Sequence, residues 1–200
     1  MLLRTYHKMM EEFNNHHGYM SFDDLKKEKF SVLQIRELED EGVIEKFARG
    51  WYWCTQCGLQ KPPDYKYIEV AKVNPESVIC MDSACYLHGI LDKEPDVISV
   101  STSREDRRKM ELRFPIRRFY LQNVGSKDEI QTVVTGFGDY KKYSLVRSFC
   151  DCFRMKSKLD EDIYLEIVNA YRNQEQLKEC LFSYAKALRA VKCVMEIDKI

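Results

Sequence analysis

Residues 31–53, SVLQIRELEDEGVIEKFARGWYW, decide the predicted fold. Ser31 is a typical N-cap, because its side-chain oxygen can accept a hydrogen bond from an unpaired backbone N–H of the first helical turn. Gly42 is suited to the left-handed position that ends many helices. The apolar residues between them recur at helical spacing: Val32, Ile35 and Leu38. The first part of the stretch therefore predicts a short amphipathic helix.

A β-hairpin is predicted directly after this helix. Residues 43–47 and 51–53 are rich in β-branched and aromatic side chains, and they flank a turn that contains Gly50. Two more helices are expected upstream. The first carries apolar residues at helical spacing between positions 2 and 13, and the second is capped by Ser21. Three short helices followed by a hairpin is the order of a winged helix-turn-helix.

The chain is predicted to have an α+β fold with two domains. Residues 1–61 form an N-terminal winged helix-turn-helix, and Pro62-Pro63 ends regular structure and marks a linker. Residues 65–200 form a mixed α+β domain, with strands expected at 97–101, 114–121 and 131–135. From Ser144 onward the pattern is helical, including one helix from Gln174 to about Val194. Strands first and helices after them are typical of an α+β arrangement.

The predicted third helix is the candidate for the major groove of duplex DNA. Its polar face carries glutamine and arginine, which can contact adenine and guanine edges, and serine, which can contact base or phosphate. Lysines precede the helix and further cations lie in the hairpin, where a phosphate backbone would pass. The expected DNA-binding residues are Lys26, Lys27, Lys29, Ser31, Gln34, Arg36, Lys46 and Arg49.

The charge of this region limits the expected electrostatic attraction. Residues 1–70 hold 10 lysines and arginines against 12 aspartates and glutamates. Acids at positions 39–41 would be repelled if they faced phosphate. Binding by a single copy should thus be weak and confined to one locally cationic face. The alternative is a winged helix used only for protein contacts, with the lysines as ordinary solvated charge.

Bulk composition places the chain among intracellular globular proteins. The 32 basic and 32 acidic residues balance, so neither nucleic acid nor a membrane attracts the chain through net charge. No apolar stretch approaches the roughly 18 residues that a membrane span needs. The N-terminal residues lack the order of a signal peptide, and eight cysteines in such a chain favour reduced thiols. We therefore expect a cytoplasmic protein with no membrane partner.

Several segments resemble AbiEi-type antitoxins, the repressor-antitoxins of abortive-infection toxin–antitoxin systems. In the first domain, residues 36–44 have the pattern R-x-L-x-x-x-G-[VI]-I, and Arg49-Gly50-Trp51-Tyr52 closes the hairpin. The likeness continues in order through most of the chain, at residues 75–79, 83–90, 97–101, 143–151, 158–162, 169–171 and 181–186. Two places depart from the family: Leu145-Val146-Arg147 replaces its acidic-basic-threonine centre, and Cys54-Thr55-Gln56-Cys57 is not a family feature.

The resemblance implies an antitoxin that also represses its own operon. The winged helix would bind inverted repeats near the promoter, and the second domain would counteract a nucleotidyltransferase-like toxin, without a stable complex being required. A different possibility is a winged-helix regulator whose second domain senses a ligand or partner, with no toxin involved.

Two basic clusters in the second domain are the candidate antitoxic surface. They comprise Arg104, Arg107, Arg108, Arg113, Arg117, Arg118, Lys141, Lys142 and Arg147. The alternative is a solvated loop and ordinary helix charge.

Neither a metal nor catalysis is expected. Cys54-x2-Cys57 and Cys80-x4-Cys85 could together hold zinc through four thiolates, but the second spacing is loose and buried thiols are common. The sequence has no phosphate-binding glycine loop, no G-x-S-x-G and no H-E-x-x-H. We therefore predict unliganded thiols, no cofactor and no enzymatic activity.

Overall fold

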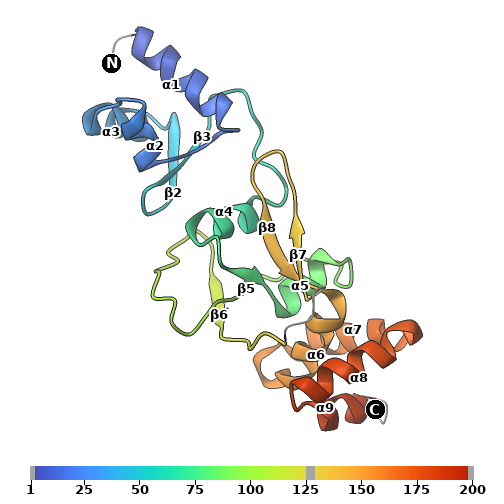
Figure 1. Ribbon diagram of the computed structural model, residues 1–200. Helices are drawn as coiled ribbons and strands as arrows, with labels where there is room; N and C mark the ends of the chain where they lie inside the picture. The colour runs from blue at the N-terminus through green and yellow to red at the C-terminus, as the bar shows by residue number, and fades with distance from the viewer. Residues whose placement is uncertain (1–2, 125–128, 198–200) are drawn as a thin grey trace. The chain divides into compact units, whose positions relative to one another are not determined.

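The computed structural model describes residues 3–124 and 129–197 and has a mixed α and β architecture (Figure 1). The chain divides into two compact units. The first contains residues 1–75, and two later segments, 108–113 and 134–139, return to it. The second contains residues 76–107, 114–133 and 140–200. The division thus falls later than the predicted boundary at residues 61–65, and it does not follow chain order.

The first unit contains the helices and hairpin that the sequence predicts, and two elements that it does not. The elements, in chain order, are α1 (Leu3–Asn15), β1 (Tyr19–Ser21), α2 (Phe22–Lys27), α3 (Val32–Asp40), β2 (Ile44–Ala48), β3 (Trp51–Cys54) and α4 (Tyr65–Val73). The unexpected elements are β1 and α4. Strand β1 pairs antiparallel with β3, so the sheet has the order β1-β3-β2.

One face of this sheet packs against the helices. Met20, Ile44 and Tyr52, one from each strand, belong to a buried cluster with residues of α1, α2 and α3. The predicted apolar positions Ile35 and Leu38 of α3 are buried in the same cluster. Removing such side chains from water is the main source of stability for a unit of this size. The cluster therefore holds α3 in a fixed position beside the hairpin.

The same three strands bury aromatic residues outside this cluster. The ring centroids of Tyr19 and Trp53 lie 4.6 Å apart, and those of Tyr19 and Phe47 lie 5.5 Å apart. The ammonium group of Lys72, in α4, lies 4.8 Å from the Tyr19 ring centroid. Burial lowers the pKa of this lysine. Helix α4 is thus tied to the sheet by a cation–π contact.

An ion pair adds a second tie between the sheet and α4. Lys61 Nζ lies 2.6 Å from the Glu69 carboxylate, which is 1% exposed, and also lies over the rings of Phe47 and Trp53. Burial raises the pKa of Glu69, and Lys61 opposes this shift. The helix that follows Pro62-Pro63 therefore packs within the first unit, and the predicted domain boundary after Lys61 is wrong.

The second unit combines a sheet with a group of C-terminal helices. Its strands are β4 (Val78–Ile79), β5 (Ile98–Ser101), β6 (Ile116–Phe119), β7 (Ile130–Val133) and β8 (Tyr140–Tyr143). Its helices are α5 (Met81–Leu87), α6 (Leu145–Arg154), α7 (Glu161–Arg172), α8 (Lys178–Ala187) and α9 (Val191–Ile197), with short 3₁₀ turns at Lys156–Lys158 and Glu175–Leu177. The sheet has the order β6-β5-β4-β8-β7 and mixes parallel and antiparallel pairs.

Helices α6 to α9 gather beside one another in the C-terminal part of the second unit (orange to red in Figure 1). The strands expected at 97–101, 114–121 and 131–135 are present, whereas β4 and β8 were not predicted. The single helix expected from Gln174 to Val194 is broken, because Arg189 adopts a left-handed conformation between α8 and α9. Among the described residues, no helix has the length and apolarity to cross a bilayer.

Arg147 is the largest fully buried side chain of the second unit. Its guanidinium donates to Glu129 and, at 2.6 Å, to Asp151, and it also donates to the backbone carbonyl of Gln122. It lies 4.7 Å from the Tyr143 ring centroid. The prediction that Arg147 belongs to an exposed basic surface is therefore wrong. Its charge is neutralised by two buried carboxylates, which are the partners that a buried cation requires.

Replacing Arg147 by methionine should lower the free energy of unfolding by about 3–5 kcal/mol, because it removes the buried cation that Glu129 and Asp151 share and leaves Asp151 paired with the partly exposed Arg154. Burial raises the pKa of Asp151, and Arg147 opposes this rise. Without Arg147, the pKa of Asp151 in the folded variant should rise further above its value in the unfolded chain. The variant should then lose stability as the pH increases from the unfolded-state pKa of Asp151 to its folded-state pKa. The penalty should therefore be smaller at about pH 5 than at about pH 7. Urea unfolding at both pH values measures the loss in free energy of unfolding. Arg104→Met, which replaces an exposed arginine, is the control. Equal stability of the two variants would contradict the buried ion-pair network.

Candidate nucleic-acid interface

Helix α3 begins with a capping box. The Ser31 hydroxyl accepts a hydrogen bond from the Gln34 backbone N–H at 3.2 Å, and the Gln34 side-chain oxygen accepts one from the Ser31 backbone N–H at 2.8 Å. The predicted cap is confirmed. The sequence also predicts DNA contacts for both side chains, Ser31 with a base or phosphate and Gln34 with adenine. In the capping box, however, Gln34 uses the amide oxygen that a bidentate contact with adenine would need. Gln34 retains its amide N–H donors for a single contact.

The outward face of α3 is partly apolar. Leu33 is 75% exposed and Val32 is 42% exposed, beside the exposed cation Arg36. The sequence prediction assigned Val32 to the core with Ile35 and Leu38, but only the latter two are buried. Val32 is the first residue of the helix, and it is not part of the buried cluster. The first helical turn therefore presents apolar and cationic side chains together.

The lysines expected on the approach to α3 are exposed. Lys26, Lys27 and Lys29 all lie on the surface, and Lys27 Nζ is 2.9 Å from the Asp24 carboxylate. This carboxylate raises the pKa of Lys27, so the lysine stays charged. Lys29 adopts a left-handed conformation just beyond α2.

A groove with further cations, which sequence analysis missed, borders the start of α3. It has a volume of about 570 Å³. Its lining includes Arg4 and Lys8 of α1 together with Lys29 and Gln34, and also the acids Glu11 and Glu28. Lys8 pairs with Glu28 at 3.3 Å. The periodic apolar pattern of α1 predicts a core helix and does not show which cations lie on its outer face. Their i, i+4 spacing was the available signal, because it places both on one face of the helix.

The hairpin contributes two more exposed cations, Lys46 in β2 and Arg49 in the turn. The acids Asp40 and Glu41 are also exposed, but they lie at the C-terminal end of α3. The exposed side chains at the opposite end of the helix are uncharged or cationic. Of the two ends of α3, the N-terminal end thus offers the better approach for an anion, and the helix dipole is also favourable there.

Of the nine cations proposed as an antitoxic surface, Arg147 is buried, and the other eight are divided between the two units. Arg108 and Arg113 belong to the first unit, where they bond Asn74 and Glu45. In the second unit Arg117 and Arg118 donate to the backbone carbonyls of Lys158 and Asp106, Lys142 donates to that of Leu87, and Lys141 pairs with Glu76 at 3.6 Å. Arg104 and Arg107 are exposed.

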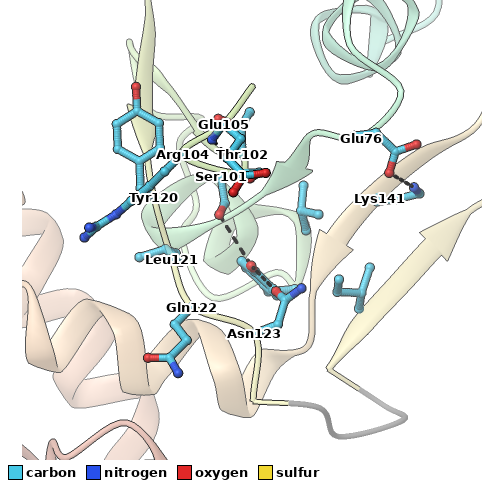
Figure 2. Close-up of a pocket in the computed structure, with 14 residues that line it drawn as sticks. Glu76, Ser101, Thr102, Arg104, Glu105, Tyr120, Leu121, Gln122, Asn123 and Lys141 are labelled. Carbon is cyan, nitrogen blue, oxygen red and sulfur yellow. Dashed lines mark hydrogen bonds and ion pairs between the residues drawn. The ribbon is translucent and has the colours of Figure 1, made fainter. Parts of the chain in front are cut away.

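A cavity of about 720 Å³ lies in the second unit, beyond the carboxyl ends of the parallel strands β5 and β6 (Figure 2). A row of hydrogen-bonding groups crosses it: the Ser101 and Tyr143 hydroxyls lie 3.4 Å apart, and Tyr143 donates to the Asn123 side chain at 3.3 Å. Burial raises the pKa of Tyr143 to about 12, so its hydroxyl remains a donor. Crevices at such strand ends are common ligand sites in sheets with parallel strands.

The cysteines proposed as zinc ligands lie in two different cores. Cys54 and Cys57 belong to the buried cluster of the first unit, whereas Cys80 and Cys85 belong to that of the second. Burial raises the pKa of Cys54 to about 12, which favours the thiol over the thiolate that zinc requires. Within residues 3–124 and 129–197, no group of three or more histidine, cysteine or acidic side chains is placed to hold a metal. The four-thiolate site is therefore not formed.

Comparison with known proteins identifies a similar fold but no family. No family model and no curated protein matches the chain. The crystal structure of the RV2827C protein from Mycobacterium tuberculosis matches 92% of this chain and 75% of its own, with a TM-score of 0.64 and 14% sequence identity. At this identity the likeness concerns the fold alone.

Proposed function

We propose that the first unit is a winged helix that binds duplex DNA, and that the chain is a transcriptional repressor. The observation that carries this proposal is the exposed N-terminal end of α3, with Leu33 and Arg36 on the surface and with Arg4, Lys8 and Lys29 lining the groove beside it. The element order α1-β1-α2-α3-β2-β3 supports this proposal, because it matches the order expected of a winged helix, whose third helix would enter the major groove.

The distribution of charge supports DNA rather than a protein as the partner. Phosphate contacts provide affinity independent of sequence, and they need cations on both sides of the inserted helix. Lys26, Lys27 and Lys29 precede α3, and Lys46 and Arg49 follow it. Asp40 and Glu41 at the far end of α3 would repel phosphate, so the helix enters the groove with its N-terminal end first.

We further propose that the repressor acts as the antitoxin of an abortive-infection system. Its support is the sequence resemblance to AbiEi-type antitoxins, which extends into the second unit. The second candidate is a repressor that responds to a small ligand. The cavity beside Ser101, Asn123 and Tyr143 favours this candidate, because it offers room for a small molecule and a few converging polar groups.

The repressor proposal predicts binding to the DNA upstream of the protein's own reading frame. Arg36→Ala should lose about 1–3 kcal/mol of discrimination against mutated sites, as expected for one good base contact. Lys46→Ala should instead weaken binding to all sequences and flatten the dependence on salt. Gel shifts over a salt series measure both effects. Wild-type affinity that is equal for promoter and unrelated DNA would contradict sequence-specific repression.

Leu33 is predicted to contact the C5-methyl group of a thymine. Leu33→Ser should reduce operator affinity while leaving thermal stability unchanged, because the side chain is 75% exposed. Replacing operator thymines one at a time by uracil removes only the methyl group. At the contacted position this replacement should weaken the wild type but not Leu33→Ser. If both proteins lose the same affinity at every thymine, Leu33 does not contact a methyl group.

The antitoxin proposal predicts that the full chain restores growth when it is co-expressed with a nucleotidyltransferase-like toxin encoded beside it. The variant Arg36→Ala/Lys46→Ala should restore growth equally well, because antitoxic action is assigned to the second domain. The expression level of both proteins is matched by immunoblot. Continued growth arrest with either protein would contradict the proposal and leave the ligand-responsive repressor as the better candidate.

A further inference from the structure

A short basic segment from the middle of the chain lies against the predicted wing. We call residues 108–113, RKMELR, the basic strap. In sequence the strap lies between β5 and β6 of the second unit, yet it belongs to the first compact unit. It contains three cations and one acid. Its placement therefore adds positive charge to a unit whose first 70 residues are slightly acidic.

Backbone pairing and two side-chain contacts hold the strap in place. Leu112 forms an antiparallel bridge with Ala48, at the end of β2. Arg113 Nη1 lies 2.6 Å from the Glu45 carboxylate. Met110 is 9% exposed, and its sulfur accepts a hydrogen bond from the Asn74 amide at 3.8 Å. These contacts fix the strap along one side of the hairpin.

Strand β2 is an edge strand of its sheet, so its outer backbone groups are open to pairing. The bridge to Leu112 uses this edge near the turn that carries Arg49. Lys46, Arg49, Glu111 and Arg113 then line one open depression of about 480 Å³. The strap thus widens the hairpin rather than covering it, because Lys46 and Arg49 remain exposed.

The surface so formed has a net positive charge. Arg113 and Glu45 neutralise each other, which leaves Lys46 and Arg49 against Glu111 in the depression. Arg108 and Lys109, both exposed, precede Glu111 in the strap and add to the positive charge. The exposed side chains of the strap are charged, whereas Met110 is turned inward. A surface of this kind suits a polyanion such as a phosphate backbone better than a protein partner, for which buried aromatic anchors are typical.

We propose that the basic strap is the outer part of the DNA interface, and that Lys109 contacts the phosphate backbone beside Lys46 and Arg49. The proposal rests on the winged-helix function proposed above. The DNA-binding surface then includes a segment that follows the first 100 residues of the chain. A winged helix without this segment would lose part of its affinity for every duplex.

The test compares the wild type with Lys109→Ala and Glu111→Gln in the full chain, on promoter DNA and on unrelated duplex, over a salt series. Loss of one phosphate contact lowers the salt slope by about 0.9. The advantage of the wild type over Lys109→Ala should thus shrink about threefold between about 50 and about 200 mM salt. Glu111→Gln should bind both duplexes more tightly than the wild type. Lys93→Ala, which removes an exposed cation of the second unit, is the matched control and should change neither slope nor affinity.

The outcomes separate the two proposals. If the wild type binds the promoter but Lys109→Ala and Glu111→Gln leave the affinity and salt slope unchanged, the strap does not contact DNA and the repressor proposal stands. If the wild type binds no duplex, the winged-helix proposal fails and the strap proposal with it. Unchanged thermal midpoints in both variants show that the comparison concerns binding and not folding, because both side chains are exposed.

Discussion

The close approach of Trp53 to Gly18 is the contact on which the first unit depends. A Cβ atom at residue 18 would lie 2.3 Å from the Trp53 ring, and Gly18 has a φ of +83°, so both space and backbone conformation require glycine. The Gly18 carbonyl also accepts the Cys54 backbone N–H at 2.9 Å. These contacts turn the chain from α1 into β1 and place β1 beside β3. The resulting sheet packs against α3 through the buried cluster that contains Ile35 and Leu38. It packs against α4 through the aromatic residues Tyr19, Phe47 and Trp53.

Local signals in the sequence were sufficient for the helices and the hairpin of this unit. Ser21 and Ser31 cap their helices as predicted, and Gly42 has the positive φ expected of a helix-ending residue. Strand β1 has only three residues, and no alternating pattern can be detected over so short a length. Its pairing with β3 joins residues 30 to 34 positions apart. Such contacts are formed by tertiary packing, which the local pattern does not encode.

The candidate site was predictable in its position but not in its details. The positions of α3 and the hairpin followed from the sequence, and so did the exposure of Lys26, Lys46 and Arg49. A sequence does not show whether a cation is solvated or buried, and Arg147 was misplaced for this reason. The available signal was Asp151, four residues later on the same helix face, since opposite charges at this spacing can pair. The capping box raised a similar ambiguity, because Gln34 suits both a helix cap and a base contact.

The strap changes how the weak charge of the first unit should be interpreted. Taken along the chain, residues 1–70 carry slightly more acid than base, which argues against strong attraction to DNA. Charge along a sequence is not charge on a surface, however, since attraction falls off over roughly a Debye length of about 10 Å at moderate salt. The acids at 39–41 lie at one end of α3, and Glu45 is neutralised by Arg113. Lys109 comes from a later segment, 55 residues beyond the end of the hairpin at Cys54. A fold that gathers cations from three parts of the chain can therefore bind a polyanion without any excess of positive charge in the protein as a whole.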